Sequence, residues 1–222
     1  MLADARLVAG KDLRIEWRSR VGIGQMVPFA VLVLVLFAFA LDPDRGILTR
    51  ATAGLYWVAT LFAGLLAVQR AFALEAAPGV REAMRLSGLD PAAWFLGKAA
   101  AIAVQLLLLE AVLGVGVVVL YSADLQGPLL LLATCLAATV GIAAAGTLYG
   151  VLAAGLAVRD TLVPLLLLPV LAPVLLGATR ASESALGNGV GDGWSWCGLL
   201  AVFAVLYTML GMTFFGTLLE ET

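Results

Sequence analysis

The chain has 222 residues, of which 63% are hydrophobic and 13% are charged, with a formal net charge of −2 and no histidine. Soluble domains carry about 45–50% apolar and about 25% charged residues, so this chain cannot supply the polar surface of a soluble protein. The composition therefore excludes a soluble enzyme, a disordered segment and a secreted disulfide scaffold. It indicates an all-α polytopic membrane protein.

Residues 1–20 are predicted to form an amphipathic helix. Its apolar side chains recur at helical spacing, at Leu2, Ala5, Ala9, Leu13 and Trp17, and basic side chains occupy the other faces. Such a helix suits the cytoplasmic interface of a membrane. The alternative is a basic N-terminal tail.

Six apolar stretches are predicted to span the membrane as helices. They cover about residues 27–41, 53–74, 95–121, 128–158, 162–178 and 194–219. The fifth stretch contains Pro164, Pro169 and Pro173, which predict a bent helix. The Gly-rich residues 179–193 are expected to form a short periplasmic loop. Since only helices and closed barrels are stable in lipid, the chain should consist of helices and short loops.

The distribution of basic residues predicts the orientation of the spans. Ten of the 13 Lys and Arg residues fall in segments 1–26, 70–98 and 158–161. The alternate loops hold the remaining three, which are Arg45, Arg50 and Arg180. The positive-inside rule therefore places both termini in the cytoplasm.

Residues 75–93 form the longest cytoplasmic loop in this topology, and part of it is compatible with a short helix. Its charged side chains are of mixed sign and are expected to be exposed: Glu75, Arg81, Glu82 and Arg85. Mixed charge suits a specific, salt-sensitive docking surface for a cytoplasmic partner. The alternative is a solvated connector.

Two polar residues are expected inside the third span. Glu110 lies near the bilayer centre, where an ionised carboxylate costs about 2.5–3.5 kcal/mol. One interpretation is a pore or proton-coupling residue. The favoured one is a neutral carboxyl that is hydrogen-bonded across a helix interface, because no intramembrane Lys, Arg or His offers a partner. Gln105 does not share a helix face with Glu110.

Motifs for catalysis, metal binding or nucleic-acid binding are absent from the sequence. Gly97-Lys98 is not a P-loop, because Ala99 follows it and Ala92 stands where glycine is required. Cys135 and Cys197 are isolated, so disulfides and zinc sites lack support. No basic block suggests nucleic acid. Gly146 and Gly150 would allow two helices to approach closely.

The order of these features resembles the membrane subunit of ABC transporters of the ABC-2 exporter type. Several motifs resemble the haem exporter protein B family, also called CcmB: Tyr56-Trp57-Val58-Ala59, Ala67-Val68-Gln69-Arg70-Ala71-Phe72, Glu75, Gly79, Glu82, Leu86-Ser87 and Lys98. Lys11-Asp12-Leu13-Arg14, Arg18-Ser19, Leu168-Pro169 and Pro173 are also similar. The chain departs from the family at Gln69, where glutamate is expected, and Glu110 has no place in the family pattern.

The resemblance implies a permease-like subunit in the bacterial inner membrane, without catalytic activity of its own. Its implied partners are a cytoplasmic ATPase subunit that binds ATP, further membrane subunits of the cytochrome c maturation complex, one of them haem-handling, and a second copy of the chain. The implied function couples ATP hydrolysis to haem delivery or to release of a haem-loaded periplasmic chaperone. The alternatives are a generic ABC-2 permease for a lipid or drug and a non-transporting scaffold.

Haem enters these expectations as a ligand that the complex handles, and no cofactor is assigned to this chain. The absence of histidine argues against tight haem ligation and leaves Met or Tyr ligation, or passage without ligation. Trp194 and Trp196 begin the sixth span and are expected to form an interfacial aromatic belt. A haem-stacking surface is the alternative for this pair.

Overall fold

A computed structural model describes residues 1–41, 45–73, 86, 88–154, 159–189 and 191–221. Its helices are α1 (Leu2–Ser19), α2 (Val21–Ala40), α3 (Arg45–Ala73), α5 (Pro91–Tyr121), α6 (Pro128–Ala154), α7 (Arg159–Ala185) and α8 (Gly193–Glu221). No strand occurs in these ranges. The prediction of an all-α polytopic membrane protein is confirmed. Five helices, α3 and α5 to α8, are long and apolar enough to cross a membrane, and the bent pair α1 and α2 would make a sixth span if counted as one.

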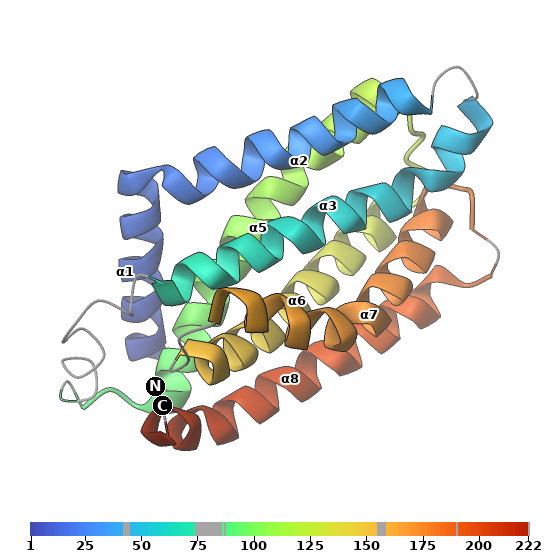
Figure 1. Cartoon of the computed structure of the whole chain (residues 1–222). Coiled ribbons are helices and arrows are strands. Elements are labelled where there is room, and N and C mark those ends of the chain that lie inside the picture. Colours follow the sequence, from blue (N-terminus) through green and yellow to red (C-terminus); the bar gives the residue numbers. More distant parts are fainter. Residues whose placement is uncertain (42–44, 74–85, 87, 155–158, 190, 222) are drawn as a thin grey trace.

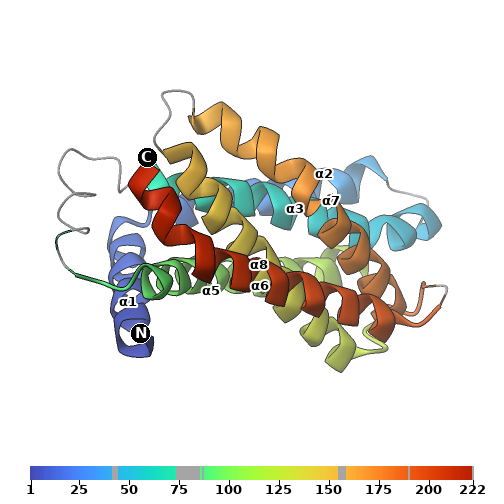
Figure 2. The same ribbon diagram turned by 90° about the horizontal axis from the view of Figure 1, so that it is seen from below.

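The long helices form a bundle in which α6 is central, packed against α3, α5, α7 and α8 (Figures 1 and 2). Both chain termini lie at one end of the bundle, together with the last turn of α3 and the first turn of α5 (Figure 1). We call this the terminal end. Helix α3 begins and α7 ends toward the opposite end (Figure 1), so Arg50 near the start of α3 and Arg180 near the end of α7 belong to that end.

Helix α1 runs across the terminal end and makes an angle of 73° with α2 (Figure 1). The chain turns between the two helices at Arg20, whose φ of 54° is left-handed. The face of α1 that is turned toward the bundle buries Ala5, Val8 and Glu16. Most of the predicted apolar stripe is not buried in the protein, and Trp17 is 67% exposed. The outward position of this side chain is the one that lipid contact requires.

Several helices extend beyond the apolar stretches that predict them, and α3 and α7 extend the furthest. Helix α3 begins at Arg45 rather than near Ala53, and α7 continues past Ala178 to Ala185. The first part of the expected periplasmic loop is therefore helical. A helix does not end where its apolar stretch ends, because its backbone hydrogen bonds are satisfied within the segment whether the side chains are apolar or polar.

Candidate functional site

A buried polar cluster at mid-depth joins α3, α5 and α6. The side chain of Glu110 on α5 is 3% exposed, and its Oε1 accepts a hydrogen bond from the hydroxyl of Thr139 on α6 at 2.5 Å. The hydroxyl of Tyr56 on α3 donates to the backbone oxygen of Glu110 at 3.2 Å and lies 3.6 Å from the sulfur of Cys135. Among the described residues, Glu110 makes no ion pair, which agrees with the interpretation of a carboxyl bonded across a helix interface.

The second carboxyl oxygen of Glu110, Oε2, accepts no hydrogen bond from any of the described residues. A carboxylate without a cation is costly to bury, whereas a protonated carboxyl can both donate and accept. The cluster therefore suits a neutral carboxyl that bonds α5 to α6, while the backbone oxygen of Glu110 bonds α5 to α3.

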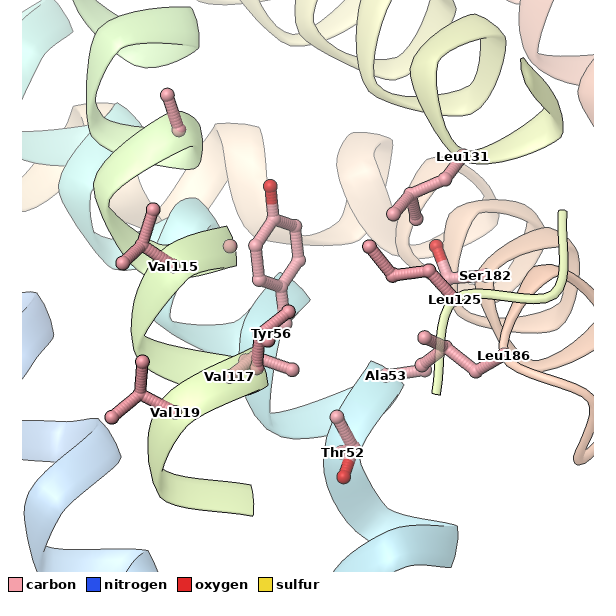
Figure 3. A pocket seen from close by; sticks show the side chains of 13 residues that line it. Thr52, Ala53, Tyr56, Val115, Val117, Val119, Leu125, Leu131, Ser182 and Leu186 are labelled. Atoms are coloured by element: carbon pink, nitrogen blue, oxygen red, sulfur yellow. The ribbon is translucent and has the colours of Figure 1, made fainter. Parts of the chain in front are cut away.

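An apolar groove lies beside this cluster, toward the end opposite to the termini. It has a volume of about 320 Å³ and lies between α3, α5, the start of α6 and the end of α7. The ring of Tyr56 stands between valines of α5, among them Val115 and Val119, and a facing set made up of Leu125, Leu131, Ser182 and Leu186 (Figure 3). Tyr56 thus lines the groove with its ring while its hydroxyl bonds the polar cluster.

A second polar cluster lies at the terminal end, where α1 meets α3 and α5. The Nζ atom of Lys98 lies 3.2 Å from Asp12 Oδ2, donates to the backbone oxygen of Ala71 at 3.1 Å, and lies 4.9 Å from the ring centre of Phe72. Lys98 is fully buried, with no exposed side-chain area.

A second ion pair lies one helical turn along α1 from the first. The Nε atom of Arg70 lies 2.8 Å from Glu16 Oε2, and another guanidinium nitrogen donates to the Ser19 hydroxyl at 3.0 Å. Asp12 and Glu16 are four residues apart and therefore share one face of α1. We call Asp12, Glu16, Arg70 and Lys98 the α1 latch.

The structure separates the residues that the sequence singled out. Gln105 is half-buried near Asp12, Glu16 and Arg70, and so lies beside the latch rather than beside Glu110. At the start of α8, Trp194 is exposed and Trp196 is half-buried. The predicted coupling residues Glu75, Arg81, Glu82 and Arg85 lie outside the described residues. So does most of the 75–93 segment, and residues 91–93 belong to α5.

The latch and the partners of Glu110 were missed by reasoning from sequence. Asp12 and Glu16 share a helix face, which is a signal that could have revealed an inward-facing pair of carboxylates. Lys98 and Arg70 were used for the topology and for the family resemblance, and neither was assigned a partner within the chain. Among the described residues, no group of three or more His, Cys, Asp or Glu side chains could hold a metal ion.

Comparison with known proteins gives a consistent result across most of the chain. The sequence model of the family described as "CcmB protein" matches residues 4–217. "Heme exporter protein B" of Rhodobacter capsulatus is 30% identical over 186 residues, which cover 83% of this chain and 85% of the relative. Proteins of the same name from Paracoccus denitrificans and Haemophilus influenzae are 29% and 28% identical, covering 80% and 79% of this chain and 82% and 79% of those proteins.

Proposed function

Because the chain belongs to the CcmB protein family, we propose that it is the membrane subunit of an ABC-type complex that exports haem for cytochrome c maturation. The observation that carries this proposal is the family match over residues 4–217, which covers all or nearly all of each candidate membrane span described. The relatives named for haem export align with 83% and 80% of this chain. The helical bundle supplies a membrane scaffold with a groove and no catalytic cluster among its described residues.

In this role a cytoplasmic partner hydrolyses ATP, and this chain passes the resulting motion to the other membrane subunits that deliver haem or release a haem-loaded periplasmic chaperone. Haem is a substrate of the complex. The chain has no histidine to ligate the iron, so its contribution is a path or a moving scaffold rather than a tight haem site. The lining of the groove is mostly apolar, and its polar residues are Thr52, Tyr56 and Ser182.

The complex sits in the bacterial inner membrane with both termini of this chain in the cytoplasm. The basic residues of α1, together with Arg70 and Lys98, gather at the terminal end, as the positive-inside rule requires of a cytoplasmic face (Figure 1). The α1 helix lies across this end with Leu2 and Trp17 exposed, and it rests in the cytoplasmic interface of the bilayer.

The test is purification of the tagged chain from its own bacterium under conditions that keep membrane complexes intact. We expect an ABC ATPase and a haem-handling membrane subunit in fixed ratio. Deletion of the chain should abolish covalent haem in periplasmic c-type cytochromes, as seen by haem staining, and re-expression should restore it. A chain that purifies alone and moves a lipid or drug in vesicles would be a generic ABC-2 permease, and the proposal would be wrong.

A further inference from the structure

Helix α1 is joined to the bundle by an unusually close approach as well as by the two ion pairs. A Cβ atom on Gly97 of α5 would lie 2.6 Å from the backbone oxygen of Ala5 and 2.6 Å from Cβ of Val8, both on α1. These atoms cannot move without moving α1 itself, because one is backbone and the other is directly attached to it. Gly97 therefore sets how near α1 lies to α5, and this distance puts Asp12 within reach of Lys98.

The latch holds both ends of the segment that connects α3 to α5. Arg70, Ala71 and Phe72 belong to the last turn of α3, which ends at Ala73. Lys98 lies near the start of α5, which begins at Pro91. The two halves of the latch thus flank the connecting segment in sequence, and α1 touches both. From α1 the chain passes directly through Arg20 into α2.

A buried ion pair at this junction constrains geometry more than it adds stability. Removing one partner leaves an uncompensated charge, whereas an apolar replacement of the whole pair is often neutral, so buried charges are best explained by the register that they impose. Lys98 has a carboxylate, a carbonyl oxygen and an aromatic face around its ammonium group. This arrangement is satisfied only when α1, α3 and α5 keep one relative position.

We infer that the α1 latch is a positioning device that makes α1 and the terminal ends of α3 and α5 move as one unit. This inference rests on the proposed function, and it names the route of coupling within this chain. A displacement applied to the segment between α3 and α5 is carried by the latch to α1 and then to α2, instead of being absorbed at the end of α3. A packed element that contacts both sites is a physical route for such coupling.

Three variants separate the latch from general packing. Gly97→Ala forces α1 away from α5 without changing any charge. Asp12→Asn removes the carboxylate from Lys98 and keeps the shape of the side chain. Exchange of charges in the second pair, Glu16→Arg with Arg70→Glu, restores an ion pair that each single substitution breaks, and the Ser19 hydroxyl can serve either arrangement. The matched controls are Gly198→Ala, whose Cβ meets nothing within 4 Å, and Arg14→Gln on the exposed face of α1.

The first measurement is hydrogen exchange of the α1 amides, made on this chain in lipid nanodiscs. We expect Gly97→Ala and Asp12→Asn to raise the exchange rate about tenfold or more, because breaking a buried pair frees the docked helix to open locally. The control variants should match the wild type. Unchanged exchange in both latch variants would show that the latch does not hold α1, and this result does not depend on any partner.

The second measurement is made on the native complex and compares ATP hydrolysis with cytochrome c maturation. We expect the latch variants to assemble and to hydrolyse ATP within about twofold of wild type while maturation falls about tenfold, because breaking a buried pair uncouples α1. The double charge exchange should recover maturation, and complex levels equal to wild type in the single variants separate uncoupling from a folding defect. Wild-type maturation in Gly97→Ala and Asp12→Asn, despite a freed α1, would overturn the inference and leave the proposed function intact.

Discussion

At the scale of single residues, the hydrogen bonds of Glu110 indicate whether its carboxyl is structural or titrates. Its Oε1 accepts from Thr139, and it makes no ion pair within the described structure. A glutamine can accept the same hydrogen bond through its amide oxygen. We therefore expect Glu110→Gln to preserve complex assembly and cytochrome c maturation. Thr139→Val should lower the free energy of unfolding by about 1 kcal/mol, since it removes the donor. Normal complex levels with complete loss of maturation in Glu110→Gln would instead indicate a titrating role.

A second prediction at this scale concerns Asp192, which caps α8. Its carboxylate accepts from the Ser195 hydroxyl at 2.8 Å and from the backbone N–H of Trp194 at 3.1 Å, and these bonds lower the pKa of Asp192 below its usual value of 3.8. A lowered pKa means that the cap is fully present above the usual pKa and is lost as the pH falls through the lowered one. The protection of the amides at the start of α8, meaning their exchange rate relative to an unstructured peptide at the same pH, should therefore fall in acid. In Asp192→Asn this amide protection should no longer depend on pH, because asparagine still caps the helix. If the protection of the variant still fell in acid as in the wild type, Asp192 would not be the titrating cap.

At the scale of helices, the Gly146 and Gly150 pair packs α6 against α3 of the same chain. A Cβ on Gly146 would lie 2.5 Å from Cγ2 of Val68, and one on Gly150 would overlap the ring of Phe72. We expect Gly146→Ala to lower the unfolding free energy by about 1–3 kcal/mol, the usual range for overpacking, and Val68→Ala to recover part of this loss. Gly198→Ala, with open space around its Cβ, is the control. Thermal unfolding in detergent measures all three, and additive losses in the double variant would exclude this contact.

The 75–93 segment remains the predicted docking element for the ATPase, although the four charged residues predicted to bind it lie outside the described chain. Its two ends connect to the helices that the latch joins. Glu82→Lys should weaken ATPase association or uncouple hydrolysis from maturation, because charge reversal opposes a salt-sensitive contact. The variant should still insert into the membrane, since no span is altered. ATPase binding is measured in a pull-down, and maturation is measured beside it. If both stay at wild-type level in Glu82→Lys and after reversal of all four charges, the segment is only a connector.

At the scale of the whole molecule, the bundle has the size of half a transporter. The chain contains no internal repeat, and ATPase subunits of this class work in pairs, as the family resemblance implies. We expect two copies in the native complex, each contacting one ATPase subunit. The mass of the intact complex, measured by native mass spectrometry, decides the copy number, and a complex with a single copy would overturn the expectation.

The sequence by itself determined the helical membrane class, the approximate position of the spans, the charge asymmetry and the family. Hydrocarbon leaves the backbone few choices, so a long apolar stretch specifies a helix without knowledge of its neighbours. The basic residues of each loop likewise determine on which side of the membrane that loop lies, independently of how the helices pack. These properties follow from contiguous residues and can be predicted from any chain that contains them.

The tertiary structure alone decided which polar groups meet. Lys98 and Asp12 are separated by 86 residues, Arg70 and Glu16 by 54, and Thr139 and Glu110 by 29, so their pairing depends on how helices far apart in sequence pack. The apolar pattern of α1 does not specify its inward face, because at an interface apolar side chains can meet either lipid or protein. The role of Gly97 also could not be predicted from sequence. Its neighbours in the sequence exclude a P-loop, but its close contact with the backbone of α1 is seen only in the tertiary structure.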